Sequence, residues 1–408
     1  MQQQGWFIKI FKGDRVIWGL VVIFMFYSLL AVYSASSALA TLKHDGNTTY
    51  FFWSQFMLLS ISMLVIVLIH YLPCRIYFSL ASLFLLIALA LLVFTLFSGK
   101  QINDATRWIT IFGISIQPSE IAKAALVIYL ARSLAFYQDE KNNFMQVTKY
   151  FMIPVVLICG LIMTENLSTS IMIFGISLII MFIGRIPFRF LLTYIGIALA
   201  AILLMVALFK AVPGIQPERY VTWEKRIETF FSKEKDADAD INADYQITQA
   251  KIAISTGGLF GKGPGKSEQR NILPQSNSDF IFAIIIEEYG LIFGAIPLIL
   301  AYMILLFRGI TIVKKCETAF PAYLVMGLII MIVVQATLNM LVAVGIFPVT
   351  GQTLPMVSWG RTSALVMSFS IGAILSVSRV INARAKKEEL QDEEKIDIGE
   401  KIYEPAKA

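Results

Sequence analysis

Charged residues are scarce in this chain: only 15% of its 408 residues are Asp, Glu, Lys or Arg, whereas 57% are hydrophobic. A soluble domain normally contains about 25% charged residues. The shortage of charge excludes an ordinary globular protein, a disordered chain and a nucleic-acid-binding protein. The length instead accommodates several membrane spans, each of about 20 apolar residues.

Histidine and cysteine are also rare, with two histidines and three cysteines in the whole chain. His44 and His70 are far apart in sequence, and Cys74, Cys159 and Cys316 form no Cys-x-x-Cys or Cys/His group with the spacing of a metal site. We therefore expect neither a histidine-based catalytic dyad nor a zinc site. We also expect no disulfide, because none of the cysteines falls in a predicted external loop.

The long apolar runs predict an all-α polytopic membrane protein with about ten transmembrane helices. The expected spans are residues 16–37, 51–69, 77–97, 118–136, 150–163, 168–183, 188–212, 279–307, 320–342 and 363–380. Residues 16–382 then form one membrane domain, with a large loop at 213–278. Residues 1–15 precede this domain, and residues 383–408 follow it.

The basic residues of the short loops predict how the helices are oriented. Lys and Arg are concentrated before the first span, in alternate loops and after the last span: Lys9, Lys12, Arg15, Arg132, Lys141, Lys149, Arg185, Arg189, Arg308, Lys314, Lys315, Arg384, Lys386 and Lys387. The positive-inside rule places both termini in the cytoplasm. The 213–278 loop is expected outside, since long loops cross largely regardless of charge. The Lys- and Glu-rich segment 383–408 is expected to be a mobile cytoplasmic tail.

Few ionisable residues lie within or beside the spans, and those few share one side. They are Glu120, Lys123, Glu165, Asp279, Glu287, Glu288 and Arg361. Such residues are costly in a bilayer, and each is a candidate for a functional site. In the predicted topology all of them belong to the outer half of the membrane. This asymmetry favours chemistry at the outer leaflet over the midplane site of a transporter.

Several of these residues also have a purely structural interpretation. Lys123 could extend to the outer interface, and Glu120 could complement the positive end of a helix that begins at Pro118. Asp279 could be a helix N-cap. Glu287 and Glu288 would repel each other when buried, which indicates that they pair with Lys or Arg in support of a site.

The glycine-rich segment 257–267 resembles a phosphate-binding P-loop but does not match its pattern. The motif requires glycine at position 260, which is Phe260. We expect instead a flexible external loop in which Lys262, Lys266 and Arg270 approach an anionic headgroup, although a solvated turn without a ligand would have the same composition.

Several motifs in order along the chain resemble the SEDS family (shape, elongation, division and sporulation; the FtsW/RodA/SpoVE proteins). They are Arg107-Trp108-Ile109, the Gln117-Pro118-Ser119-Glu120 stretch ending at Lys123, Tyr245-Gln246 with Gln249, the glycines of 257–263, Leu273-Pro274 with 279–283 and 287–290, and 348–360 with its Ser358-Trp359-Gly360. The chain departs from the family pattern at Gln275, Asn277, Ser278, Arg361, Thr362 and 166–169.

This resemblance implies a ten-helix peptidoglycan glycosyltransferase that polymerises lipid II into β-1,4 glycan strands, with inversion, at the outer face of the bacterial cytoplasmic membrane. The stretches 32–37, 263–270 and 339–343 favour the division branch of the family and a location at the septum. An elongation polymerase, a lipid II flippase and a non-enzymatic division scaffold are the alternatives.

The resemblance also implies roles for individual residues. Asp279 is the expected catalytic base, and Glu120 is expected to orient Lys123. Substrate contacts are expected from Arg107, Glu120, Lys123, Arg226, Lys262, Ser358 and Arg361, with support from Gln117, Gln249, Glu287 and Glu288. No cofactor is required by the sequence, although Mg²⁺ or Mn²⁺ could bridge a diphosphate and a carboxylate. The implied partners are lipid II and its polyprenyl-diphosphate-linked glycan, a class B penicillin-binding protein with transpeptidase activity, and other division proteins.

Overall fold

The computed structural model describes residues 11–36, 48–98, 100–102, 105–111, 114–211, 223–224, 241–273 and 275–403, and its architecture is a bundle of long helices. The helices are α2 (Arg15–Ala35), α4 (Thr48–His70), α5 (Cys74–Ser98), α6 (Pro118–Phe136), α7 (Phe144–Val147), α8 (Ile153–Met163), α9 (Leu167–Ile183), α10 (Phe188–Ala211), α12 (Ile241–Gly257), α13 (Ile281–Gly290), α14 (Ile296–Lys314), α15 (Ala319–Ala343) and α16 (Arg361–Tyr403). Short helical turns lie at η1 (Asp139–Asn142), η2 (Thr148–Met152), η4 (Gln269–Asn271) and η5 (Leu291–Ala295).

Every expected membrane span coincides with one of these helices or with a run of consecutive ones. Among the described residues, eight helices or helical runs are long and apolar enough to cross a membrane, and α9 is a shorter apolar helix. Helix α6 is not among the eight, and it carries three charged residues, Glu120, Lys123 and Arg132. Two of these charges, Glu120 and Lys123, belong to the site described below.

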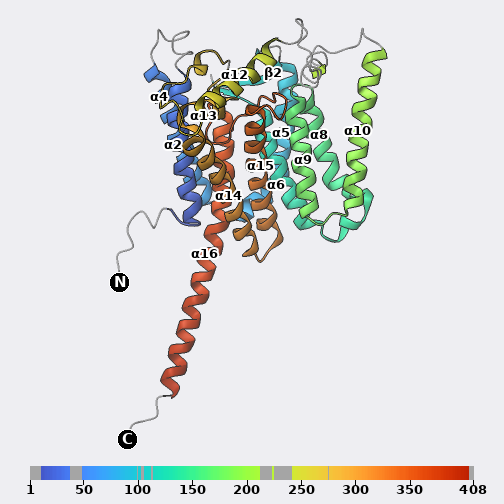
Figure 1. Cartoon of the computed structure of the whole chain (residues 1–408). Coiled ribbons are helices and arrows are strands. Elements are labelled where there is room, and N and C mark those ends of the chain that lie inside the picture. Colours follow the sequence, from blue (N-terminus) through green and yellow to red (C-terminus); the bar gives the residue numbers. More distant parts are fainter. Residues whose placement is uncertain are drawn as a thin grey trace.

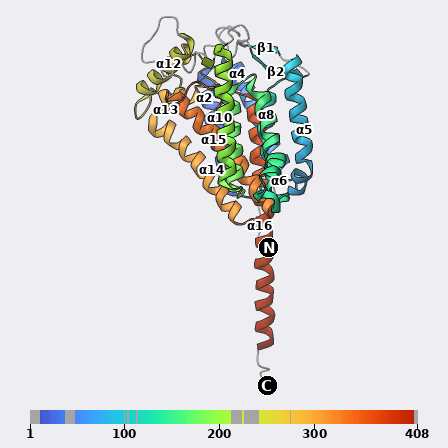
Figure 2. The same ribbon diagram turned by 90° about the vertical axis from the view of Figure 1, so that its right-hand side faces the viewer.

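The two ends of the bundle differ, as the predicted topology requires. The start of α2 and the protruding part of α16 lie at one end, whereas α12 and the strand β2 (Ala105–Ile111) lie at the other (Figures 1 and 2). We call these the α16 end and the α12 end. The expected sidedness makes the α16 end cytoplasmic.

A small antiparallel sheet at the α12 end was not expected from the sequence. Strand β2 pairs with β1 (Lys100–Ile102) and with β3 (Ile114–Ile116), in a register that sets Ile109 opposite Ile116. Alternating isoleucines such as Ile109, which is buried, fit a half-covered strand. A search for apolar runs of about 20 residues does not detect strands of three to seven residues.

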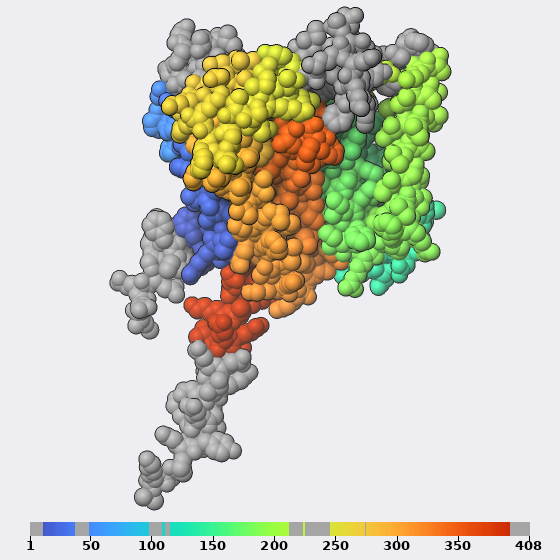
Figure 3. Space-filling model, viewed as in Figure 1, coloured from blue at the N-terminus to red at the C-terminus, as the bar shows by residue number. Residues whose placement is uncertain are grey.

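The last helix continues far beyond its expected end at residue 380. Helix α16 runs to Tyr403 and leaves the bundle as a single helix (Figure 1), and the coloured part of it below the bundle stands clear in Figure 3. The tail expected from residue 383 is therefore helical as far as Tyr403, which was not predicted from the sequence. This segment is rich in Lys and Glu, which have high helix propensity.

The helices begin where local side chains or proline favour a start. Asp14 caps α2 by accepting hydrogen bonds from the amides of Val16 and Ile17 (2.9 and 3.2 Å). Asn166 caps α9 in the same way. Helix α6 starts with Pro118, whose missing N–H suits a first helical position. Helix α6 packs between α5 and α15 in the core of the bundle, which buries most of its residues.

Candidate active site

A buried ion pair lies at the beginning of α6. The Lys123 ammonium is 2.7 Å from Glu120 Oε1, and the two side chains are 1% and 5% exposed. Lys123 Nζ also donates to Gln335 Oε1 (2.7 Å) and to Gln352 Oε1 (3.4 Å). An ammonium has three hydrogens, and here each has an acceptor. The alternative in which Lys123 extends to the membrane interface is therefore wrong, whereas the expected pairing with Glu120 is present.

Amide side chains extend this pair into a network that reaches Asp279. Gln352 Nε2 donates to Thr169 Oγ1 (2.6 Å), and Gln335 Nε2 donates to the carbonyl of Thr353 (3.0 Å). Asn339 Nδ2 donates to two backbone carbonyl oxygens, those of Gln352 (2.7 Å) and Asp279 (2.8 Å). The network thus connects α6, α9 and α15 with the backbone of the expected catalytic residue.

Sequence reasoning missed Gln335, Asn339, Gln352 and Thr169 as parts of the site. A signal for two of them was present: Gln335 and Asn339 interrupt the apolar helix α15 at positions i and i+4, which face the same side of a helix. An unpaired amide in an apolar span is costly, as an ionisable side chain is, so both positions indicate buried polar contacts.

The segment around Asp279 is fixed by hydrogen bonds to the loop before α16. Ser358 Oγ donates to the Ser278 carbonyl (2.6 Å) and accepts from the Leu354 amide (2.8 Å). The Trp359 amide donates to the Asn277 carbonyl (2.8 Å). Ser358, expected to contact substrate, therefore holds the backbone beside Asp279 in this structure.

Asp279 itself is half-buried and precedes α13 by two residues. The N-cap position of α13 is Phe280, whose side chain makes no capping hydrogen bond. Asp279 therefore does not occupy the N-cap position that the structural interpretation gave it.

Glu287 and Glu288 form a second buried cluster, which anchors the glycine-rich loop. Glu287 accepts from Lys262 Nζ (2.9 Å) and from the amides of Glu268 and Gln269 (3.1 and 3.3 Å). Arg270 lies 4.0 Å from Glu288. The expected pairing of both carboxylates with basic residues is thus present.

The backbone of this loop lies directly against α13, so the expected flexible loop is wrong. Gly261 and Gly290 have φ angles of +81° and +71°, and a Cβ on Gly261 would come 2.2 Å from the Glu288 carbonyl oxygen. Only glycine fits such an approach. The hydrogen bond to Glu287 raises the pKa of the Lys262 ammonium. Lys262 is therefore a loop anchor whose charge is already compensated by Glu287.

Replacing Glu287 by glutamine tests this anchoring. Without its charge, the side chain forms weaker hydrogen bonds with Lys262 and the two amides. The free energy that holds the loop closed should fall by about 2 kcal/mol. When the loop opens and closes faster than a protease cuts it, the cleavage rate is proportional to the fraction of molecules with an open loop. Cleavage of the 258–270 loop should then be roughly 30-fold faster in the variant. Glu268→Gln is the matched control, because the Glu268 side chain is 76% exposed and its 3.5 Å ion pair with Lys262 lies at the surface, where such pairs contribute little. Equal cleavage rates for the two variants would show that Glu287 does not hold the loop.

The remaining expected site residues lie around the start of α16 or outside the described part of the chain. Arg361 is the exposed first residue of α16, and the next residue, Thr362, accepts from the Gln117 amide (3.1 Å). Arg107 belongs to β2, and Gln249 is half-buried on α12. Arg226 lies outside the described residues.

Among the described residues, no group of three or more His, Cys, Asp or Glu side chains is arranged to hold a metal ion. A divalent cation at Asp279 would accordingly need most of its ligands from a bound diphosphate.

Comparisons with known proteins agree with one another. Residues 14–383 match a family model described as "Cell cycle protein", the FtsW/RodA/SpoVE family. The chain is 30% identical over 377 residues to a protein of Geobacter metallireducens named "Probable peptidoglycan glycosyltransferase FtsW", covering 91% of this chain and 96% of that one. It is 31% identical over 379 residues to "Stage V sporulation protein E" of Bacillus subtilis, covering 90% and 97%.

Solved structures share the fold. The crystal structure of the rod shape determining protein RodA of Thermus thermophilus matches with a TM-score of 0.64 at 22% identity, covering 90% of this chain and 97% of that one. A chain from a structure titled "Structural coordination of polymerization and crosslinking by a peptidoglycan synthase complex" also matches with a TM-score of 0.64, at 24% identity, covering 90% and 98%.

Proposed function

The chain belongs to the FtsW/RodA/SpoVE family and is a multi-pass membrane peptidoglycan glycosyltransferase involved in cell division, and we propose that it polymerises lipid II with Asp279 as the catalytic base. The supporting observation is the network from the Glu120–Lys123 pair through Gln352 and Asn339 to Asp279.

The proposed reaction joins two lipid-linked sugars. The 4-hydroxyl of the GlcNAc of one lipid II attacks the anomeric carbon of the growing glycan, and its proton passes to the Asp279 carboxylate. The new β-1,4 C–O bond forms with inversion as the bond to the polyprenyl diphosphate breaks, and the diphosphate leaves with the electron pair. A positioned general base contributes about 10²–10⁴-fold to such a step.

The leaving diphosphate needs positive charge that reaches the surface. Arg361 meets this requirement because it is exposed and begins α16, where the helix dipole also favours an anion. We assign Arg107 and Arg226 the same role by family resemblance. Lys123 acts differently: its donors are occupied and it is 1% exposed, so it stabilises negative charge through the network rather than by direct contact. If a divalent cation takes part, the Asp279 carboxylate would be the residue that holds it, and the ion would supply positive charge to the leaving diphosphate.

We further assign the site to the outer face of the bacterial inner membrane, at the division septum. The basic residues of the short loops support this orientation. A class B penicillin-binding protein is the proposed partner, since cross-linking by a transpeptidase must follow polymerisation. The matching chain from a complex that coordinates polymerisation and crosslinking supports this pairing.

The test is polymerisation of labelled lipid II by the purified full-length protein together with its cognate transpeptidase partner. We expect glycan ladders on a gel. A lipid II flippase would instead move labelled lipid II across vesicle membranes without forming polymer, and a scaffold would do neither. Either of those outcomes would overturn the proposed function.

A further inference from the structure

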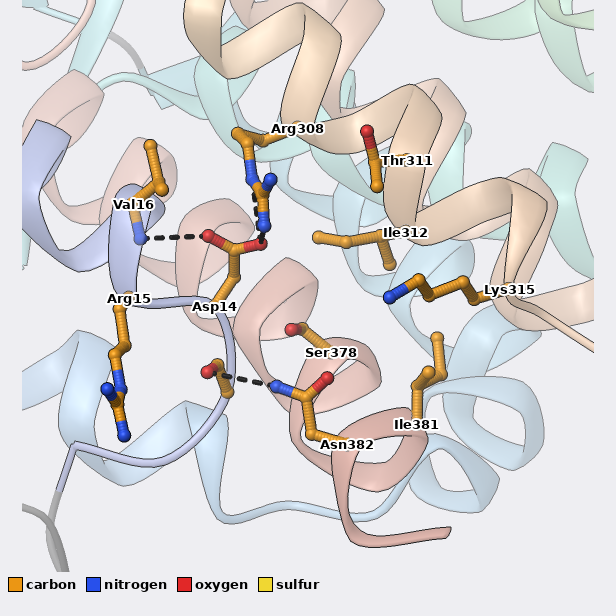
Figure 4. A pocket seen from close by; sticks show the side chains of 11 residues that line it. Asp14, Arg15, Val16, Arg308, Thr311, Ile312, Lys315, Ser378, Ile381 and Asn382 are labelled. Carbon is orange, nitrogen blue, oxygen red and sulfur yellow. Dashed lines mark hydrogen bonds and ion pairs between the residues drawn. The ribbon is translucent and has the colours of Figure 1, made fainter. Parts of the chain in front are cut away.

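Two cavities lie at the α16 end of the bundle, opposite the candidate active site. The first has a volume of about 380 Å³ and lies between the start of α2, the end of α14 and α16 (Figure 4). The second, of about 690 Å³, lies between the start of α5, the α14–α15 connection and α16. We call them the α2 cavity and the α5 cavity. Lys315 and Ile381 line both, so the cavities adjoin each other.

Four of the eight charged residues that line the two cavities form ion pairs with each other. Asp14 accepts from Arg308 Nε (2.9 Å) and from the Val16 amide (2.9 Å), so both of its carboxylate oxygens are used. Arg384 pairs with Glu317 (2.5 Å). These contacts compensate two of the basic side chains within the protein itself.

Lys315, Arg15 and Arg75 are the basic lining residues whose side chains form no ion pair with any residue that the structure describes. Of these three, only Lys315 lines both cavities, and its ammonium points into the α2 cavity, as Figure 4 shows. Ser378 and Asn382 line the same cavity. With Asp14 committed to Arg308, no carboxylate among the residues lining the α2 cavity remains to neutralise Lys315.

The α5 cavity combines positive charge with apolar walls. Arg75 and Lys315 line it together with the paired Arg384, whereas Glu388 is the one acidic lining residue not paired with Arg384. Its apolar walls are formed by Phe78, Phe320, Val377 and Val380. A cationic rim above apolar walls, at the ends of membrane helices, fits a phosphate that carries a hydrocarbon tail.

We propose that Lys315 and the two cavities bind an anionic glycerophospholipid of the leaflet at the α16 end. The phosphate lies against the Lys315 ammonium, with Asn382 and Arg75 nearby, and an acyl chain follows Phe78 and Phe320. The positive-inside rule alone also explains basic residues at this end. It makes no distinction, however, between Lys315 and its neighbour Lys314, which lines neither cavity.

The experiment compares ligands and these two lysines in the full-length protein, purified in a neutral detergent. Short-chain phosphatidylglycerol is titrated while the thermal unfolding midpoint is recorded, and short-chain phosphatidylcholine and inorganic phosphate are titrated in parallel. We expect phosphatidylglycerol alone to raise the midpoint. Lys315→Gln removes one positive charge, and Lys315→Glu also adds a negative one. The half-maximal concentration of phosphatidylglycerol should therefore rise roughly fivefold for Lys315→Gln and roughly 25-fold for Lys315→Glu. Lys314→Gln should match wild type.

Three results would overturn the proposal. An equal effect of phosphatidylcholine would mean that only apolar contacts are recognised. An equal effect of inorganic phosphate would assign the site to a free anion rather than a lipid. Equal weakening by Lys314→Gln and Lys315→Gln would mean that general charge, not the cavities, attracts the lipid. Lys315 is exposed and unpaired among the described residues, so its substitution is expected to leave the unliganded midpoint unchanged.

Discussion

Replacing Asp279 by asparagine is expected to lower lipid II polymerisation at least about 100-fold, because the amide cannot accept the proton of the attacking hydroxyl. The side chains are nearly the same size, and Asn339 and Ser358 hold the backbone on either side of the carboxylate through carbonyls that the substitution retains. We therefore expect the variant to fold. Measurement of glycan product from labelled lipid II, at saturating substrate, gives the loss directly.

The control and a second variant sharpen this test. Asp139→Asn changes an exposed aspartate in η1, in the connection between α6 and α7, and should polymerise like wild type. Asp279→Ala should be as inactive as Asp279→Asn. Normal polymerisation by both Asp279 variants, with unchanged thermal midpoints, would rule out Asp279 as the base.

The sequence predicted the parts of this site that depend on charge and on long-range apolar pattern. Charges within apolar spans identified Glu120, Lys123 and the pair Glu287–Glu288, because a buried charge needs a partner wherever the chain folds. The apolar runs located the helices, whose ends lie within a few residues of the expected ones for most spans.

The sequence did not predict contacts that depend on how helices pack. Thr169 lies in the first turn of α9 and Gln352 in the connection between α15 and α16, where polar residues are ordinary. Only the folded bundle brings their side chains within 2.6 Å of each other. The anchored loop is a similar case. Its composition suggests flexibility, but amides and Lys262 converge on Glu287 from residues about 20 positions away.

The second large effect is expected at Lys123. Lys123→Met should lower polymerisation at least about 100-fold, a loss typical of removing one preorganised electrostatic group. The same change leaves Glu120 buried without its partner, which should destabilise the protein by about 3–5 kcal/mol. Reduced activity of this variant alone would therefore not separate an electrostatic role from simple unfolding. Lys314→Met serves as the control for a lysine outside the network.

The double variant Glu120→Gln with Lys123→Met separates the two effects. It removes both charges together, so the unpaired carboxylate disappears and most of the lost stability should return. If the ammonium supports the reaction through Gln352 and Asn339, polymerisation by the double variant should stay at least about 100-fold below wild type although its thermal midpoint recovers. Recovery of activity together with stability would instead reduce the Glu120–Lys123 pair to a structural element of α6.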